Sequence, residues 1–411
     1  MSNATPTRHD RTRLLARTFA TRLEEVKQGF VERDEVVDLL ALATLCREHA
    51  LLIGPPGTAK TRLIERYCRI LDTSPFTYLL TRFTEPAELF GPIDLRKFQD
   101  QSVYEVNTSG MLPEARIAFL DEVFQGSSAI LNTLLTLVNE RNFFTGSKTI
   151  HGRLITLLGS SNEIPDDPVL AAFSDRFLFR CRLDYVADDE VEEVLGLGWQ
   201  AEQQQIRTDP ALVDGQFGKA PVKSPVKVAG TDRSQVAFPL ADLAVLQQAL
   251  ADIDLSAVRD PYARIVRALR AEGIAFSDRR AVKAQKAFAA SALLAGRLRA
   301  EISDLAVLTR LWTDPRDEQS LRRIVADHGV PVDTPGRILR DPYDLRIDLR
   351  ECRNRLALLR TSDEIREMLR LLGRLAAEAR RDHPAEQPLL KEISQAQRET
   401  LTKLREDFPE E

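Results

Sequence analysis

The chain lacks the features that mark disulfide-stapled, zinc-binding or membrane-spanning proteins. Its 411 residues include only four cysteines, which lie far apart, and no C-x-x-C pair or Cys/His cluster. No apolar run approaches the roughly 18 residues that a spanning helix needs, so no stable membrane insertion is expected. The polar start MSNATPTRHD has no apolar segment behind it. We therefore expect no signal peptide and predict a cytoplasmic location.

A strong excess of one charge is also absent. The formal net charge is -5, which gives no general attraction to nucleic acid or anionic membranes. The five histidines are scattered, and neither G-x-S-x-G nor H-E-x-x-H occurs, so a fused protease is not expected. Hydrophobic content of 43% and charged content of 29% are typical of globular proteins. The length favours two or three domains.

Short apolar segments alternate with helical stretches in the first half of the chain. This pattern predicts an α/β fold, with a largely parallel sheet covered by helices on both faces. The apolar segments are ALLIG, FTYLLTRF, IAFLDE and RLITLLGSSN. Two further segments, LRKFQDQSVYEV and NFFTGSKTIHG, have apolar arms around a polar turn and are predicted to be hairpins inserted into this core.

The character of the sequence changes near residue 200. We expect a nucleotide-binding core over residues 1–190 and a helical lid over 191–290, with a flexible loop at about 201–237, which is rich in Pro, Gly and polar residues. Residues 291–411 are predicted to form a C-terminal helical domain. A capping box at Thr361 and Glu364 marks the start of one of its helices.

The segment LLIGPPGTAKT resembles a phosphate-binding loop between a strand and a helix. Backbone N–H groups and the helix N-terminus would bind phosphate, Lys60 the outer phosphates, and Thr61 magnesium. The generic pattern has glycine where Ala59 stands. We expect Ala59 to have a negative φ at the helix entrance, where a methyl group is tolerated. The predicted nucleotide-binding residues are Gly54, Pro55, Pro56, Gly57, Thr58, Ala59, Lys60 and Thr61.

Two further apolar segments end in polar side chains that suit phosphate hydrolysis. IAFLDE ends in Asp121, predicted to hold magnesium, and in Glu122, predicted to polarise the attacking water. GSSNEIP supplies Asn162, which can hydrogen-bond the γ-phosphate or that water. A local turn is the alternative reading of Asn162.

Three arginines complete the candidate set. Arg176 suits developing phosphoryl charge and could act on the neighbouring subunit's nucleotide, with a surface ion pair to Asp175 as the alternative. FSDRRA offers Arg279 and Arg280, one of which could reach the bound phosphates from the lid. A solvated basic helix start is the alternative reading of this pair.

Taken in this order, these elements resemble the MoxR family of AAA+ ATPases, with the RavA-type members closest. The resemblance covers roughly residues 11 to 320, and the stretch TRFTEPAELFGP is specific, since generic P-loop enzymes lack it. The segments that carry the resemblance are LLIGPPGTAKT, LLTRFTEPAELFGPI, SGMLPEARIAFLDEVF, AILNTLLTLVNER, GSSNEIP and LAAFSDRF. In this family the loop commonly reads A-K-[ST], so Ala59 fits it.

The resemblance implies a P-loop AAA+ core with two insert hairpins, followed by an all-helical lid. It implies Walker A and Walker B roles for Lys60-Thr61 and Asp121-Glu122, sensor 1 for Asn162, an arginine finger at Arg176, and sensor 2 at Arg279, with Arg280 as the fallback. It also implies ATP and Mg²⁺ as cofactors, a homo-hexameric ring, a von Willebrand factor A domain partner and a protein client. Chaperone-like remodelling or cofactor insertion would be the function.

The resemblance is weak in two regions. The loop at about 201–237 is poorly matched, and RavA-type members carry a β-rich module in their C-terminal half, where this chain reads as helical, so the metabolic enzyme that this module binds is not expected as a partner. Two other functions stay open: a helicase-like nucleic-acid motor and a nucleotide-gated scaffold. The insert tips carry few basic residues, which speaks against nucleic acid. The presence of Glu122, Asn162 and Arg176 speaks against an inactive scaffold.

Overall fold

The computed structural model describes residues 8–103, 105–145, 148–208, 237–332, 342–356, 359–382 and 386–408. They fall into two compact units, one that ends at Val332 and one that follows it.

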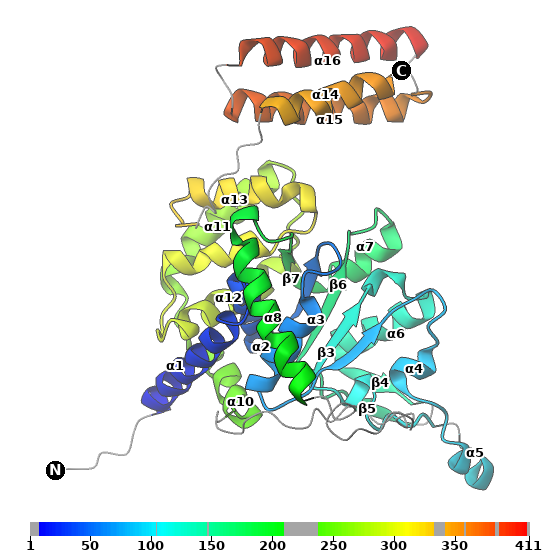
Figure 1. The fold of residues 1–411 in the computed structure, drawn as a ribbon, viewed down its shortest axis with the longest axis vertical. Coiled ribbons are helices and arrows are strands. Elements are labelled where there is room, and N and C mark those ends of the chain that lie inside the picture. The colour runs from blue at the N-terminus through cyan, green and yellow to red at the C-terminus, as the bar shows by residue number, and fades with distance from the viewer. Residues whose placement is uncertain are drawn as a thin grey trace, which may run out of the picture. The chain divides into compact units, whose positions relative to one another are not determined.

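A five-stranded parallel sheet forms the centre of the first unit (Figure 1), as the sequence predicted. Its order is β2-β3-β6-β1-β7, and each neighbouring pair is parallel. The carboxyl ends of all five strands therefore meet at one edge of the sheet. The strands are β1 (His49–Ile53), β2 (Phe76–Leu79), β3 (Ile117–Asp121), β6 (Thr156–Ser161) and β7 (Phe177–Arg182).

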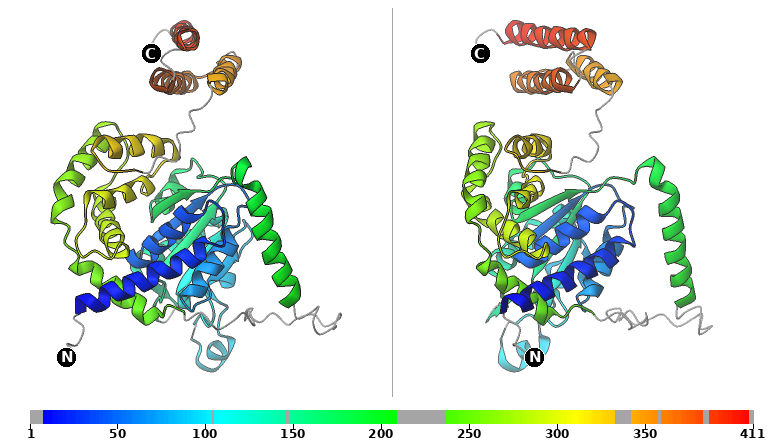
Figure 2. Two further views of the ribbon diagram at one scale, coloured as in Figure 1. Left: turned by 60° about the vertical axis from the view of Figure 1, so that its left-hand side comes forward. Right: turned by 90° about the vertical axis from the view of Figure 1, so that its left-hand side faces the viewer.

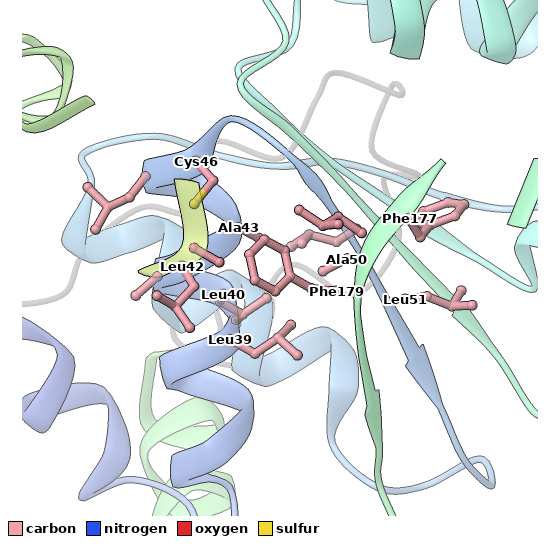
Figure 3. Packing of buried hydrophobic residues seen from close by; sticks show 14 of the residues in the cluster. Leu39, Leu40, Leu42, Ala43, Cys46, Ala50, Leu51, Phe177 and Phe179 are labelled. Atoms are coloured by element: carbon pink, nitrogen blue, oxygen red, sulfur yellow. The ribbon is translucent and has the colours of Figure 1, made fainter. Parts of the chain in front are cut away.

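Helices cover the sheet because their apolar faces need burial. On α2, side chains such as Leu39 and Leu40 pack toward Ala50 of β1 and Phe179 of β7 (Figure 3), and all four are almost fully buried. The helices of this part are α1 (Arg8–Lys27), α2 (Asp34–Cys46), α3 (Lys60–Ile70), α4 (Pro86–Phe90), α5 (Leu95–Gln101), α6 (Ser128–Glu140), α7 (Pro168–Ser174) and α8 (Val191–Thr208), with 3₁₀ turns η1 (Leu112–Glu114), η2 (Val123–Gln125) and η3 (Asp188–Glu190).

A second group of helices lies together on one side of the sheet (Figure 2). One continuous hydrophobic cluster runs from Ala16 to Val330, so this group shares its core with the sheet. The group consists of α10 (Leu240–Ala249), η4 (Leu250–Asp252), α11 (Ser256–Ala271), α12 (Asp278–Leu294), η5 (Ile302–Arg310), η6 (Pro315–Asp317) and α13 (Glu318–Asp327).

Of the two predicted insert hairpins, the structure forms one. The second is present as the antiparallel pair β4 (Asn142–Phe144) and β5 (Thr149–His151). The first prediction was wrong in its arms, because residues 95–101 form the helix α5. Asp94 caps this helix by accepting hydrogen bonds from the backbone N–H groups of Arg96 and Lys97. An antiparallel bridge between Ile93 and Val106 closes the base of this insert.

The domain boundaries differ from the sequence prediction in two places. Helix α8 continues to Thr208, so the predicted loop does not begin at 201, and the rest of that loop up to 236 lies outside the described residues. The predicted boundary at 290 falls inside α12, whose buried face belongs to the shared core. The compact units divide after Val332 instead.

The second unit is helical, as predicted. It comprises α14 (Pro342–Leu356), α15 (Ser362–Asp382) and α16 (Gln387–Asp407), which pack around their own cluster, including Met368, Leu372 and Ile393. The predicted capping box is present: the Glu364 N–H donates to Thr361 Oγ1 (3.3 Å), and the Thr361 N–H donates to Glu364 Oε2 (3.0 Å). Within the described residues of the whole chain, every helix is too short or too polar to cross a bilayer.

Candidate nucleotide-binding site

The glycine loop connects the carboxyl end of β1 to the first turn of α3, as predicted. A Cβ atom at Gly54 would lie 1.9 Å from the carbonyl oxygen of Leu183, so only glycine fits there. Gly57 has φ +82°, a conformation that favours glycine. The loop therefore owes its path to these two residues, and it ends at the N-terminus of α3, where unpaired N–H groups favour an anion.

Ala59 departs from the prediction. Its φ is +61°, in the left-handed region, and it is the N-cap of α3. A methyl-bearing residue is disfavoured there, because Cβ approaches the following carbonyl oxygen. The expected negative φ was wrong: the chain still turns at Ala59, and alanine adopts the conformation for which the generic pattern uses glycine.

Lys60 is folded back over the loop. Its Nζ donates hydrogen bonds to the carbonyl oxygens of Gly54 (2.8 Å) and Pro55 (2.9 Å). Burial lowers the pKa of Lys60, while the carboxylates of Asp121 and Glu122 act to raise it. The ammonium group thus lies at the centre of the loop and within the field of both acidic residues.

The acidic pair sits where β3 ends. The Ser160 hydroxyl donates a short hydrogen bond to Asp121 Oδ1, and the backbone N–H of Glu122 donates to the same oxygen (3.2 Å). Partial burial and, after it, the charge of Asp121 raise the pKa of Glu122, and Lys60 opposes this shift. A carboxylate with a raised pKa is a better proton acceptor.

Asn162 joins this pair from the next strand. Its Nδ2 donates to Glu122 Oε1 (3.0 Å), because β6 lies between β3 and β1 in the sheet. The side chain of Asn162 therefore contacts a residue that follows the neighbouring strand β3. The carboxyl ends of β1, β3 and β6 therefore bring Lys60, Asp121, Glu122 and Asn162 together, and we refer to them as the carboxyl edge.

The predicted arginines lie at the opposite end of the strands. Arg176 directly precedes β7, whose first residue Phe177 pairs with His49 at the start of β1. Arg279 Nη2 donates to Asn139 Oδ1 (2.9 Å), and the neighbouring Val138 carbonyl contacts the ring of His49. These groups form what we call the amino edge. Since β1 has five residues, the two edges are about 15 Å apart.

The expectation was that Arg279 or Arg280 reaches the bound phosphates from the lid, and within one chain both lie at the amino edge. Arg280 is 3% exposed, and its guanidinium donates to the carbonyl oxygens of Leu178 (2.9 Å) and Leu311 (3.1 Å) and to Asp175 Oδ1 (3.2 Å). It therefore fastens α12 to β7. Arg279 stays on the surface.

Arg176 is held differently from Arg280. Its Nη1 lies 3.9 Å from Asp175 Oδ2, beyond hydrogen-bonding distance, and its buried Nε has no hydrogen-bond partner among the described residues. A buried guanidinium N–H without a partner is uncommon. The predicted ion pair with Asp175 is thus loose, and the guanidinium keeps capacity for another acceptor.

Sequence reasoning missed several polar residues that support the site. Ser160, which fixes Asp121, was visible only as part of GSSNEIP. Strand β7 was also missed, together with the buried Arg180, which donates to the Ser174 carbonyl (2.8 Å) and lies over the Trp312 ring. A third group joins Glu48 to Lys283 and Lys286. Apart from Arg180 and Ser174, the partners in these contacts are far apart in sequence, so no local pattern predicts them.

Comparison with known proteins agrees with this geometry. Residues 17–218 match a family model described as the MoxR domain in the MoxR-vWA-beta-propeller ternary systems, and residues 257–325 match an AAA lid domain. Two uncharacterised proteins of Methanocaldococcus jannaschii are 33% and 34% identical over 72% and 74% of this chain, and over 71% and 72% of their own lengths.

Two more distant similarities are consistent with these. The chaperone MoxR1 of Mycobacterium tuberculosis is 25% identical over 43% of this chain and 47% of that protein. The crystal structure of a candidate ATPase from Cytophaga hutchinsonii superposes with a TM-score of 0.57, at 17% identity, over 78% of this chain and 98% of that one. At that identity the superposition speaks for the fold alone.

The fold and the carboxyl edge define a P-loop nucleotide-binding core joined to a helical lid. With the family match, the chain belongs to the MoxR family of AAA+ ATPases. Its predicted closeness to the RavA-type members stays a prediction.

Proposed function

We propose that this chain hydrolyses ATP with Mg²⁺ at a site completed by a second copy of the chain in a ring. The observation that carries the proposal is the separation of the two edges. Lys60 and Glu122 lie at the carboxyl edge, whereas Arg176 and Arg279 lie about 15 Å away, at the other end of the strands. Arginine fingers supplied from a neighbour are an established way to complete a phosphoryl-transfer site.

The residues of the carboxyl edge suit the half of such a site that binds the nucleotide and its metal ion. In this proposal the loop N–H groups from Gly54 to Lys60 bind the phosphates, and Lys60 exchanges its loop carbonyls for phosphate oxygens. Thr61 and Asp121 hold Mg²⁺, which when bound neutralises the phosphate charge. The hard oxygen donors of a hydroxyl and a carboxylate are what this ion prefers.

Glu122 and Asn162 suit the handling of the attacking water. Glu122, whose pKa is raised by burial, accepts the proton of the water, and Asn162 keeps the carboxylate oriented through its 3.0 Å hydrogen bond. Arg176 and Arg279 of the neighbouring copy then stabilise the charge that develops on the phosphoryl group. Since the two edges differ, the proposed contact is head-to-tail, which forms a ring when the rotation between copies closes, and the family resemblance implies a closed hexamer.

We further propose that hydrolysis drives chaperone-like remodelling of a protein client. The matched family's description names von Willebrand factor A and β-propeller components, and the MoxR1 relative is called a chaperone. A von Willebrand factor A domain protein is therefore the expected partner, and insertion of a cofactor into the client is one form of the activity. The expected location is the cytoplasm.

A nucleic-acid motor is the second candidate, and the inserts disfavour it. Lys97 of α5 lies 2.8 Å from Glu105, and Lys148 of the hairpin lies 3.8 Å from the same carboxylate. Two of the basic insert side chains, Lys97 and Lys148, are thus partly neutralised within the protein. A nucleotide-gated scaffold, the third candidate, does not need Glu122 and Asn162 in contact.

The first experiment measures ATP hydrolysis and mass in solution over a concentration series, for the wild-type protein and Arg176→Ala. We expect specific activity to rise with assembly, and the variant to bind ATP but lose turnover by about a thousandfold. A monomer with the same specific activity at every concentration would overturn the shared site.

A further inference from the structure

A small cavity at the amino edge gathers positive charge. It lies where α12 begins and β7 begins, and its volume of about 10 Å³ is at the lower limit for a single water molecule, so a ligand would rest against its mouth. Of the six residues that line it, four are cationic and one is acidic: Arg176, Arg279, Arg280, Lys283, Asp175 and Leu178. The net positive charge of this lining favours the binding of an anion.

Lys283 lies on the same face of α12 as Arg279. The two are four residues apart, a spacing that places side chains one above the other on a helix. Arg280, between them in sequence, points into the protein and is occupied by carbonyl oxygens. Arg176, Arg279 and Lys283 therefore form the cationic rim of the cavity.

Lys283 shares its ion-pair partner, Glu48, with a second lysine, Lys286. Its Nζ lies 2.5 Å from Glu48 Oε2, while Lys286 Nζ lies 2.8 Å from Glu48 Oε1. The Glu48 side chain is 5% exposed, so its charge needs at least one cation nearby. With Lys286 in place, Lys283 can turn to an arriving anion without leaving a buried carboxylate unpaired.

Glu48 also connects this cluster to the nucleotide loop. Its carbonyl oxygen accepts a hydrogen bond from the Thr156 hydroxyl (2.7 Å), and the next residue, His49, begins β1. The same strand ends at the glycine loop. A lysine that exchanges Glu48 for a phosphate would therefore change its contact next to the first residue of β1, the strand that leads into the glycine loop.

We propose that Lys283 is a third cation, with Arg176 and Arg279, that contacts the phosphates of the neighbouring copy's ATP by exchanging its bond to Glu48. This inference rests on the proposed shared site. Lys286, which holds the same carboxylate but does not line the cavity, is expected to have a structural role only.

The test compares Lys283→Met with Lys286→Met in the full-length ring. Both substitutions remove one of the two lysines of Glu48, so both should lower the unfolding midpoint to a similar degree. We expect only Lys283→Met to lower kcat by tenfold or more, with unchanged ATP affinity and ring mass. Equal kcat values for the two variants would overturn the inference.

Mixed rings decide whether Lys283 acts on the neighbour. Glu122→Gln subunits cannot hydrolyse their own ATP but keep Lys283, and Lys283→Met subunits keep Glu122. In randomly mixed rings about a quarter of the interfaces join an intact Glu122 to an intact Lys283, so activity should return above that of either variant. No recovery would mean that Lys283 does not act across the interface.

The same mixture with Arg176→Ala separates this inference from the proposed function. If Arg176→Ala with Glu122→Gln recovers activity while Lys283→Met with Glu122→Gln does not, the shared site stands and the role of Lys283 is refuted. If neither pair recovers although rings form, the shared site itself is refuted.

Discussion

The carboxyl edge and the amino edge of the sheet differ in backbone strain and in how their charged residues are paired. At the carboxyl edge, Ala59 and Glu122 adopt left-handed backbone conformations, and the pKa of Glu122 is raised by burial. At the amino edge, Glu48 and Arg280 are buried and each has several partners. In the proposed function the carboxyl edge performs the chemistry and contains the strained residues, whereas the amino edge fastens the lid to the sheet and presents its remaining cations to a neighbouring copy.

The largest effect at the carboxyl edge is expected from a substitution of Glu122. Glu122→Gln should keep the hydrogen bond from Asn162 but remove the proton acceptor, so ATP turnover should fall by about a thousandfold or more while ATP binding persists. Steady-state hydrolysis and equilibrium binding of ATP measure the two effects. Ser161→Ala, at the end of the neighbouring strand β6 and with its hydroxyl bonded to the Glu163 carbonyl, is the control. Turnover within tenfold of the wild type would show that Glu122 is not the base.

Substitution of the two adjacent arginines, Arg279 and Arg280, should affect activity and stability differently. Arg280→Ala should lower the free energy of unfolding by roughly 2–5 kcal/mol, because buried carbonyl oxygens lose their donor. Arg279→Ala removes an exposed contact to Asn139 and should leave stability almost unchanged, but should lower turnover in the ring by tenfold or more. Denaturant unfolding and ATP hydrolysis measure the two effects. A large stability loss in Arg279→Ala would remove the distinction between them.

The fold was largely predictable because apolar periodicity and the glycine loop are local signals. The parallel sheet and the β4–β5 hairpin follow from the apolar pattern, and the capping box follows from the local motif of Thr361 and Glu364. The α5 insert was not predictable from alternation alone, because the cap by Asp94 favours a helix over a short strand. The roles of Arg279 and Arg280 depend on which of two adjacent side chains points inward, and that is decided by contacts with β7 about 100 residues away.

His49, at the amino edge, should make the free energy of unfolding depend on pH. Its Nδ1 accepts from the Leu157 N–H (2.9 Å) and its Nε2 faces the Val138 carbonyl (3.3 Å), so the neutral ring is held. Burial, and after it the charge of Arg141, lowers the pKa of His49 to about 3. The unfolded chain therefore takes up the proton first. The stability is complete above pH ~6.5 and falls as the pH drops toward 3, by at most about 1.4 kcal/mol per pH unit.

Unfolding free energies between pH 7 and 5 test this for the wild type and His49→Asn. The asparagine offers an oxygen to the Leu157 N–H but does not titrate in this range. We expect the variant to be less stable at pH 7 and to lose less stability on acidification. Parallel pH profiles for the two proteins would show that His49 is not the group responsible.

The smallest effect is expected at Ala59, where the strain of the carboxyl edge can be measured directly. At φ +61° an alanine costs about 1–2 kcal/mol relative to the right-handed region, and glycine avoids this but gains freedom in the unfolded chain. Ala59→Gly should therefore raise the free energy of unfolding by about 0.5–1 kcal/mol. Ala263→Gly, inside α11, should lower it by about 1 kcal/mol. If both substitutions destabilise equally, Ala59 is not strained, and the contrast between the two edges rests on charge alone.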